Sequence, residues 1–403
     1  MTRRLFVPGR IELFGKHVDY GGGISMTCAI AEGITADVEP VDVAVIDLED
    51  RRTGRRARVP LRRDARPGGA HGGTYIAAVA RRLARDFGPL RRGVRVLSES
   101  SLPRSAGLSS SSAFVTMLTM AVAEANELTQ RSDWQRYLGD RLALAEYCGA
   151  VETGGAFGPW SGERGVGTRG GSQDHVAILC NEERRVGVYG YLPARRIGDA
   201  AFPSQWSLLV ATSGVRATKT GAAQADYNRA ADLVHDLLAR WNASTGRQDR
   251  SLAAAFGSST DAATQLDRLA NASADAPLLL ARLTQFQRDV NVGVPGALTA
   301  IQQADAAGLG RWAVESQQGA ETALRNQVPE TMFLARAAMA SGAHASSAFG
   351  AGFGGAVWAI CDAADSAAVL RRWREQYLQA FPLRASRAEW LQLQPAAGLR
   401  WLD

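Results

Sequence analysis

Hydrophobic and polar residues alternate in short runs in the N-terminal part of the chain, which is the pattern of half-buried strands. The run ITADVEPVDVAVIDLED (34–50) is rich in β-branched residues and alternates in part, and VRVLSES (94–100) has the same character. Both runs predict β-strands. The stretch between them, 53–73, is polar and glycine-rich, and it predicts a hairpin or a surface loop.

Hydrophobic residues then recur at helical spacing in three segments, 74–88, 113–128 and 133–152. In the first segment arginines occupy one helical face and aliphatic residues the other, which predicts an amphipathic helix. The next segment, 153–171, has no periodicity. Its glycines, proline and tryptophan predict a flexible lid or an inserted loop.

The second half of the chain has a different order of elements. The apolar run WSLLVATS (206–213) predicts a strand, and helical spacing dominates 228–341. The run AVWAI (356–360) and the closing WLQLQPAAGLRWL (390–402) indicate that a sheet is completed late in the chain. Mixed and partly segregated helices and strands predict an α+β fold.

The length of 403 residues suits two domains and a sizeable core. We place the division at the short strand after 205, giving domains 1–205 and 206–403, with the last strand at about 388–403. A hydrophobic content of 46% with 21% charged residues is ordinary for a soluble protein.

The basic charge does not indicate a nucleic-acid partner. The formal net charge is +6, but the arginines are scattered in pairs without the interleaved aromatic residues of a strand-binding groove. The four cysteines have no zinc-site or disulfide-framework spacing, so free thiols are expected. No signal-peptide core or membrane-spanning run is visible. We therefore expect a cytoplasmic monomer or homodimer with no membrane partner.

The stretch LPRSAGLSSSSAFVTML (102–118) carries the strongest chemical signal. Small residues form a tight turn, and four serines stand directly before an apolar-periodic helix. Backbone N–H groups and hydroxyls at the positive end of a helix form an anion site. The alternative is a single serine N-cap, but one cap needs only one serine. The stretch lacks the ending of a P-loop, so we interpret it as a different phosphate-binding loop.

A second glycine-rich turn, SSAFGAGFGGAVWAI (346–360), leads into a predicted strand. Its glycines permit close approach of the backbone to a ligand. Glycine-rich hairpins are common, so this turn gains weight only beside the serine loop.

Several segments together resemble the galactokinase family of GHMP small-molecule kinases. They are GRIELFGKHVDYGGG (9–23), LPRSAGLSSSSA (102–113), GGSQDH (170–175), SSAFGAGFGG (346–355) and QPAAGLRWL (394–402). The first, G-R-x-x-x-x-G-x-H-x-D-Y-x-G-G, is specific to sugar kinases of this family. The resemblance runs from about Phe6 to the end of the chain. It implies a ribosomal-S5-like N-terminal domain, a ferredoxin-like C-terminal domain, and a cleft between them where ATP phosphorylates an anomeric hydroxyl.

The resemblance also implies roles for individual residues. Arg10 would stabilise the transferring phosphoryl group, and Asp174 would take the proton of the sugar's C1 hydroxyl. The expected ATP-binding residues are Gly107, Ser109, Ser110, Ser111 and Ser112. Ser111 and Glu146 would hold Mg²⁺. These residue types suit phosphoryl transfer, in which positioning and charge neutralisation do most of the work.

The sugar-binding set combines the family pattern with two departures from it. The expected substrate-binding residues are Lys16, His17, Asp19, Gly171, Arg216, Lys219 and Tyr227. The family usually has Glu at the position of Lys16, facing the far end of the hexose. The spacing from Arg216 to Tyr227 is about three residues longer than expected and brings in Lys219. These are the only two lysines in the sequence.

An ammonium group suits a carboxylate or a phosphate. We therefore expect an acidic or already phosphorylated acceptor, such as a heptose or octose phosphate or a uronic acid. The alternative with a neutral acceptor is a galactokinase acting on galactose. A second alternative is a non-catalytic sensor of sugar and ATP. Kinases of mevalonate or homoserine are less consistent with the sequence, because they lack the H-x-D-Y signature.

Overall fold

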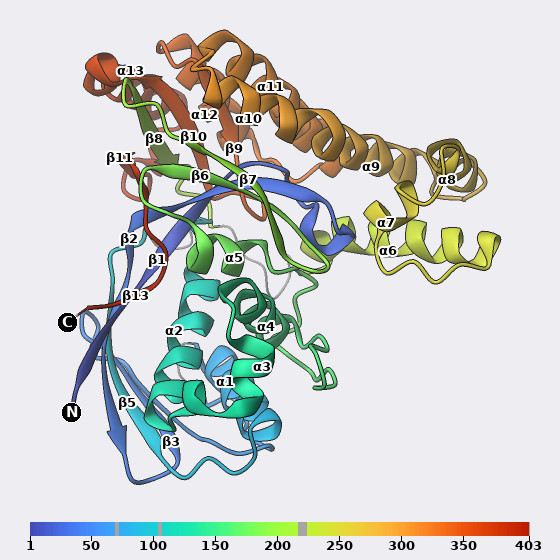
Figure 1. Ribbon diagram of the computed structural model, residues 1–403. Coiled ribbons are helices and arrows are strands. Elements are labelled where there is room, and N and C mark those ends of the chain that lie inside the picture. The colour runs from blue at the N-terminus through green and yellow to red at the C-terminus, as the bar shows by residue number, and fades with distance from the viewer. Residues whose placement is uncertain (69–71, 104–106, 217–223, 403) are drawn as a thin grey trace.

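The computed structural model describes residues 1–68, 72–103, 107–216 and 224–402. The chain forms two parts, each built on a β-sheet covered by helices (Figure 1). The long strands β1 (Arg3–Phe14) and β2 (Ile24–Val41) extend from the first part toward the second. This arrangement is the predicted α+β fold.

The first sheet has the strand order β13-β1-β2-β5-β3-β4, with β12 and β6 also paired to β2, and β7 paired to β6. The pairing of β3 with β5 is parallel. The strands of this sheet are β1 (Arg3–Phe14), β2 (Ile24–Val41), β3 (Val45–Asp50), β4 (Arg56–Pro60), β5 (Gly93–Ser100), β6 (Arg185–Gly190), β7 (Arg195–Ala201), β12 (Pro395–Ala396) and β13 (Arg400–Leu402). The predicted strand 34–50 is thus two strands, because the chain turns between β2 and β3.

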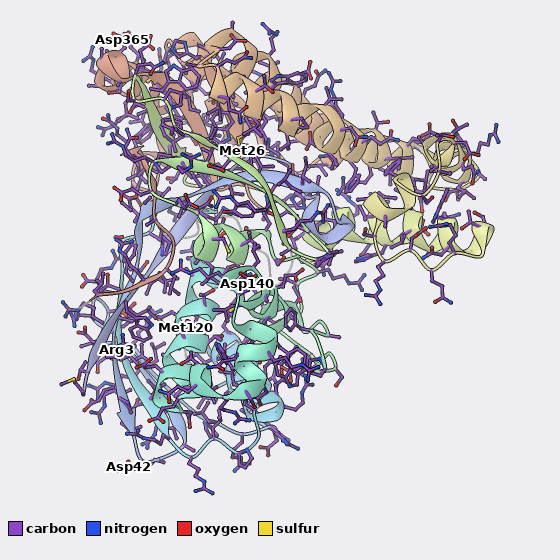
Figure 2. All side chains as sticks on the ribbon, viewed as in Figure 1. Arg3, Met26, Asp42, Met120, Asp140 and Asp365 are labelled. Atoms are coloured by element: carbon purple, nitrogen blue, oxygen red, sulfur yellow. The ribbon has the colours of Figure 1, made fainter. Side chains whose placement is uncertain are left out.

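A layer of helices covers one face of this sheet (Figure 1). The helices are α1 (Gly73–Asp86), α2 (Ser110–Ala125), α3 (Ser132–Leu138), α4 (Arg141–Thr153) and α5 (Gln173–Cys180). Met120 on α2 lies within this layer and Met26 lies on β2 beneath the second part, both buried (Figure 2). Helix α2 packs on β1 and β2, so its N-terminus lies close to the middle of β1.

The second sheet has the order β11-β8-β10-β9 and is antiparallel throughout. Its strands are β8 (Trp206–Thr212), β9 (Ala345–Ala348), β10 (Ala356–Asp362) and β11 (Trp390–Leu393). Helices α12 (Pro329–Ala340) and α13 (Ser366–Ala380) share a core with one face of this sheet. Residues of the other face, including Trp358, join the core of the first sheet.

Most of the remaining helices form an arm that projects from the second part (Figure 1). The arm consists of α6 (Gln224–Thr245), α7 (Leu252–Phe256), α8 (Ala262–Asn271) and α9 (Ala276–Arg288). The two helices that follow, α10 (Val294–Gln302) and α11 (Ala306–Gly319), pack on β7 and β9 and belong to the main core. Helices α6 to α9 have their own core, which includes Val18 and Tyr20 from the loop after β1. The arm therefore packs directly on the segment between β1 and β2.

The end of the chain departs from the expected division. Strand β11 completes the second sheet, but β12 and β13 return to the first sheet and pair with β2 and β1. Residues 395–402 therefore do not belong to the second sheet, as a domain 206–403 would require. The division of the rest of the chain into two domains at residue 205 stays a prediction.

The four cysteines are free thiols, as their spacing indicated. In the described ranges, none of the helices combines the length and the hydrophobicity that a membrane crossing requires.

Candidate active site

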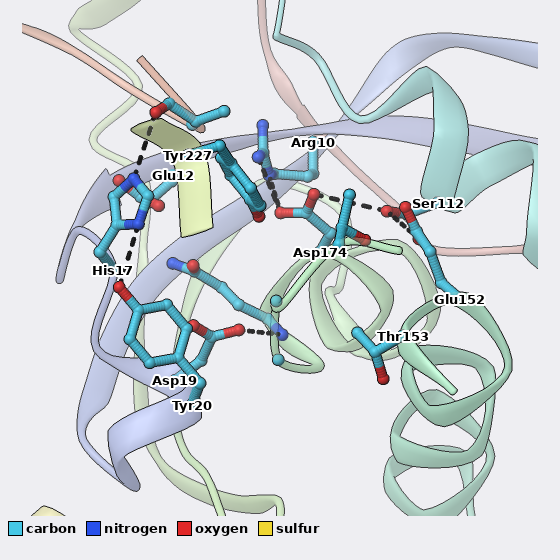
Figure 3. A pocket seen from close by; sticks show the side chains of 16 residues that line it. Arg10, Glu12, His17, Asp19, Tyr20, Ser112, Glu152, Thr153, Asp174 and Tyr227 are labelled. Carbon is cyan, nitrogen blue, oxygen red and sulfur yellow. Dashed lines mark hydrogen bonds and ion pairs between the residues drawn. The ribbon is translucent and has the colours of Figure 1, made fainter. Parts of the chain in front are cut away.

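A pocket lies where β1, α2, α4, α5 and the glycine-rich turn after β9 meet (Figure 3). Its lining residues are Arg10, Glu12, His17, Asp19, Tyr20, Ser112, Glu152, Thr153, Thr168, Gly170, Gly171, Gln173, Asp174, Tyr227, Gly350 and Ala351. Alternation along β1 explains the first two, because residues two apart on a strand share a face. Arg10 and Glu12 are each 2% exposed.

Arg10 and Asp174 form an ion pair at the centre of the pocket (Figure 3). Nε of Arg10 donates to Oδ1 of Asp174 at 2.8 Å, and the NH2 nitrogen lies 2.7 Å from the same oxygen. Asp174 stands in the first turn of α5, where the helix dipole stabilises a negative charge. Its carboxylate can accept a proton from a substrate hydroxyl while the guanidinium neutralises adjacent charge.

The loop after β1 presents His17, Asp19 and Tyr20 to the pocket. Oδ2 of Asp19 accepts a hydrogen bond from the backbone N–H of Gln173 at 3.1 Å. A Cβ atom on Gly171 would lie 2.6 Å from Cγ of Asp19, so only glycine fits there. Burial raises the pKa of Asp19, and the hydrogen bond from Gln173 opposes that rise.

Helix α9 supports this loop from behind. Arg282, which is fully buried, donates to the backbone oxygen of His17 and, at 3.3 Å, to the hydroxyl oxygen of Tyr20. The Tyr20 hydroxyl is 3.1 Å from Nδ1 of His17, and Nε2 of His17 is 3.3 Å from the carbonyl oxygen of Ala351. The ring of Tyr227 lies 6.0 Å from that of His17.

The serine loop leads into helix α2 through Ser109. Ser109 is the N-cap residue, its φ is 62°, and its side chain makes no capping hydrogen bond. Its hydroxyl oxygen is buried and has no hydrogen-bond partner in the described ranges. Ser110 is exposed and Ser111 is half-buried, so the first N–H groups of the helix are close to solvent. An uncapped N-terminus with a buried hydroxyl suits a phosphate.

The second glycine-rich turn lies against this loop. The backbone oxygen of Gly107 accepts from NH1 of Arg10 at 2.6 Å, and a Cβ atom on Gly350 would lie 3.1 Å from that oxygen. The two glycine-rich segments, far apart in sequence, therefore meet beside Arg10.

The acidic partner of the serine loop is Glu152 rather than Glu146. The hydroxyl of Ser112 donates to Oε2 of Glu152 at 2.9 Å and lies 3.4 Å from Oδ2 of Asp174. Glu146 lies outside the pocket lining and accepts a hydrogen bond from the backbone N–H of Ala194 at 2.8 Å. Six residues on a helix correspond to about 600° of rotation, so the two glutamates of α4 face different directions.

Lys16 does not reach the pocket, which corrects its expected role. The side chain is 1% exposed, and its ammonium group donates to the hydroxyls of Ser316 at 2.6 Å and Ser347 at 2.9 Å. Burial lowers the pKa of Lys16, and the carboxyl groups of Glu12 and Asp289 oppose that shift. The lysine side chain therefore points into the interior of the second part, and not toward a sugar bound in the pocket.

The other departure, at Lys219, stays a prediction. Lys219 lies outside the described residues. Arg216 is exposed and is not among the lining residues. Of the expected set, the structure brings Arg10, His17, Asp19, Ser112, Gly171, Asp174 and Tyr227 to the pocket.

The segment 153–169 is packed onto the helical layer, not raised from it as a lid. The ring of Trp160 lies 5.1 Å from that of Phe87 and 5.5 Å from that of Tyr147. Arg82 donates to the backbone oxygen of Gly155 at 2.7 Å. Aromatic and arginine contacts thus anchor a stretch whose glycines suggested flexibility.

The sequence pattern missed several lining residues. They are Glu12, Tyr20, Glu152, Thr153, Thr168, Gly170, Gln173 and Ala351, whereas Gly350 belongs to the glycine-rich turn that the sequence had indicated. Glu152 carried a usable signal, because it falls on the buried stripe of α4, four residues after Cys148. Glu12 carried another, because it shares the strand face of Arg10. A carboxyl group on a buried face indicates a functional site.

The ionisation of Glu12 gives a test by pH. Burial raises the pKa of Glu12 to about 8; Lys16 and Arg10 oppose this shift, and Asp174 and Asp19 add to it. Between pH 5 and 8 the folded state therefore binds more protons at Glu12 than the unfolded chain, so its contribution to the free energy of unfolding falls as pH rises. Glu12→Gln removes this titration. We expect the variant to gain up to about 3 kcal/mol relative to the parent protein between pH 5 and 8.

Urea unfolding of the parent protein and Glu12→Gln at pH 5 and at pH 8 measures this difference in the free energy of unfolding. Glu99→Gln, at an exposed position of β5, is the control and should follow the parent protein. Parallel stability curves for the parent protein and Glu12→Gln would contradict the raised pKa.

Three family models match the chain. They are the GHMP kinases N terminal domain at 74–157, the galactokinase galactose-binding signature at 4–40, and the GHMP kinases C terminal domain at 297–379. The galactokinase of Streptomyces coelicolor is 26% identical over 404 residues, covering 98% of this chain and 93% of that protein. The galactokinase of Actinobacillus pleuropneumoniae serotype 3 is 24% identical, covering 88% of this chain and 84% of that protein.

Solved structures share the same fold. The Lactococcus lactis galactokinase complexed with galactose aligns with a TM-score of 0.79 at 18% identity, covering 100% of this chain and 95% of that one. The Methanococcus jannaschii mevalonate kinase aligns with a TM-score of 0.58 at 13% identity and covers 98% of both chains.

Fold, site and family models together define a GHMP kinase, an enzyme that uses ATP to phosphorylate a hydroxyl group. Within that class, the chain belongs to the galactokinase family, the sugar-kinase branch to which the 9–23 motif pointed.

The expectation of an acidic or phosphorylated acceptor is wrong. The two relatives described above, which match this chain over most of its length, are galactokinases, and a galactokinase complexed with galactose shares its fold. The physical reason lies in Lys16, whose ammonium group is held by two serines outside the pocket.

Proposed function

We propose that this protein is a galactokinase that transfers the γ-phosphoryl group of ATP to the C1 hydroxyl of galactose. The galactokinase relatives and the galactose-binding signature over 4–40 support this substrate. The proposal depends on one observation above all, the Arg10–Asp174 ion pair beside the uncapped N-terminus of α2.

Asp174 acts as the proton acceptor in this proposal. The C1 oxygen of the sugar forms a bond to the γ-phosphorus, and the bond from that phosphorus to the β–γ bridging oxygen breaks to release ADP. The hydroxyl proton moves to the Asp174 carboxylate. Arg10, which already contacts Asp174 at 2.7 Å, lies where its guanidinium can stabilise charge on the transferring group.

The nucleotide phosphates bind at the serine loop. The N–H groups at the start of α2 and the buried hydroxyl of Ser109 supply donors, and Gly107 keeps the backbone open to close approach. Ser112 lies at the junction, since its hydroxyl is within 3.4 Å of Asp174 and 2.9 Å of Glu152.

Ser112 and Glu152 fit Mg²⁺, which prefers oxygen ligands and keeps several waters and substrate phosphates. In the described ranges there is no cluster of three or more His, Cys, Asp or Glu side chains that could hold a metal. In this proposal the phosphates of the nucleotide supply further oxygen ligands. The ion would neutralise charge on the β- and γ-phosphates.

The charge of the pocket favours a neutral sugar. Beside the Arg10 guanidinium, its lining includes the carboxyl groups of Glu152 and Asp174, in addition to Glu12 and Asp19, whose pKa values burial raises. A carboxylate or phosphate on the acceptor would meet like charges at short range, which is unfavourable in a buried site.

The proposal is tested by measuring ADP release with galactose, glucose, galacturonate and galactose 6-phosphate. We expect galactose to have the highest kcat/KM and phosphorus NMR to place the product phosphate on the anomeric oxygen. Preference for galacturonate or galactose 6-phosphate would reject the proposal. Galactose-dependent thermal stabilisation without turnover would indicate a sensor.

A further inference from the structure

Glu12 is a buried carboxyl group on the pocket wall that lacks a partner for its Oε1 atom. The side chain is 2% exposed and lines the pocket, and Oε1 has no hydrogen-bond donor in the described ranges. A buried polar atom without a partner costs free energy, and such atoms in native proteins call for an explanation. A ligand that brings its own donor supplies one.

The nearest lysine does not satisfy Glu12. The charge of the Lys16 ammonium group acts on Glu12, while two of its three N–H donors go to the hydroxyls of Ser316 and Ser347. Glu12 therefore has a counter-charge behind it and an unfilled acceptor.

Its position along β1 relates Glu12 to the reacting atoms. Arg10 and Glu12 pair with Ala29 and Thr27 of β2 in unbroken register, so their backbone positions are about 6.6 Å apart on one strand face. Arg10 contacts Asp174, which serves the C1 hydroxyl in the proposed reaction. A hexose ring with C1 at Asp174 can extend one of its other hydroxyls toward Glu12.

We propose that Glu12 determines specificity by hydrogen-bonding one sugar hydroxyl other than the reacting C1 hydroxyl. This inference rests on the proposed function of the same pocket. It identifies Glu12 as the residue that discriminates between a hexose with that hydroxyl and the deoxy sugar that lacks it. A hydroxyl is the matching partner because it donates without adding charge beside Lys16 and Arg10. Burial also raises the pKa of Glu12 to about 8, so a neutral ligand group suits it better than an ion.

The test crosses variants of Glu12 with sugars that each lack one hydroxyl. The parent protein, Glu12→Gln and Glu12→Met are assayed with galactose and with its 2-, 3-, 4- and 6-deoxy forms. In the parent protein we expect loss of one particular hydroxyl to lower kcat/KM about 10- to 100-fold. Glu12→Met replaces the acceptor with a side chain of similar volume. In this variant, removal of the same hydroxyl should therefore lower kcat/KM less than about 3-fold.

Two variants separate recognition from structural support. Glu12→Gln keeps an acceptor oxygen and should retain most of the hydroxyl-specific penalty. Asp289→Asn changes another buried carboxyl group whose charge acts on Lys16 but which lies outside this pocket. It should keep the full penalty, whatever its effect on stability.

Each outcome decides between the two proposals. Galactose turnover with equal deoxy-sugar penalties in the parent protein and Glu12→Met overturns the role of Glu12 and leaves the galactokinase proposal standing. If another neutral hexose proves to be the substrate, the deoxy forms of that hexose are assayed instead. A hydroxyl-specific penalty that disappears only in Glu12→Met then supports the role of Glu12, while galactose is rejected as the substrate. If Glu12→Met does not fold, equal penalties in the parent protein for all four hydroxyls overturn the inference.

Discussion

Asp174→Asn is expected to lower kcat by about 100- to 10,000-fold, because an amide cannot accept the proton of the attacking hydroxyl. Asparagine has nearly the same shape as aspartate and keeps one oxygen for the contact with Arg10. Binding of sugar and nucleotide should therefore change little, and the loss should fall on kcat rather than on KM. Steady-state assays and calorimetric binding of galactose measure the two effects separately.

Asp37→Asn is the matched control for this substitution. Asp37 also pairs with arginines, Arg4 at 2.7 Å and Arg51 at 2.6 Å, but on the surface of the first sheet. Its kcat should equal that of the parent protein. A kcat for Asp174→Asn within about 10-fold of the parent value would remove Asp174 from the role of base.

Glu152→Gln is expected to raise the Mg²⁺ concentration needed for half-maximal activity by about 10- to 100-fold. An amide oxygen is a weaker ligand than a carboxylate, and the Ser112 hydroxyl loses its charged acceptor. Titration of free Mg²⁺ at fixed ATP measures the shift. Thermal unfolding in the absence of ligands should be recorded too, because Oε2 of Glu152 also lies 3.3 Å from Nε2 of His175.

Glu146→Gln is the control on the same helix. Its carboxyl group is held by the backbone of Ala194, and the Mg²⁺ dependence should stay at the parent value. The reverse result, with a shifted Mg²⁺ dependence in Glu146→Gln and a normal one in Glu152→Gln, would indicate Glu146 as the metal ligand, as the resemblance first implied.

The local motifs that lie within one turn or one helix start could be predicted from sequence. The serines at the start of α2, the Gly171–Asp174 turn and the His17–Asp19 spacing each carry their geometry in a few adjacent residues. The helix itself begins three residues earlier than the spacing predicted, so Ser110, Ser111 and Ser112 lie in its first turn and only Ser109 precedes it. The strand face that Arg10 and Glu12 share is local in the same sense, although only Arg10 was singled out.

The direction of two side chains could not be predicted from sequence. Glu146 and Glu152 lie on one helix, and their roles depend on which face of α4 packs against α2 and α5. The rotation of α4 about its axis is set by its contacts with α2 and α5, so the sequence of α4 alone does not determine which glutamate faces the pocket.

Sequence alone determined the family and the α+β fold. It also indicated that the serine loop (102–113) and the 9–23 motif occur in one chain, as expected for nucleotide and sugar binding. Each of these inferences rests on short-range patterns. Tertiary structure alone decided what Lys16 does. Its ammonium group is bound by serines 300 and 331 residues away, on α11 and β9. A long flexible side chain points wherever distant packing provides partners, so its charge by itself cannot identify a substrate.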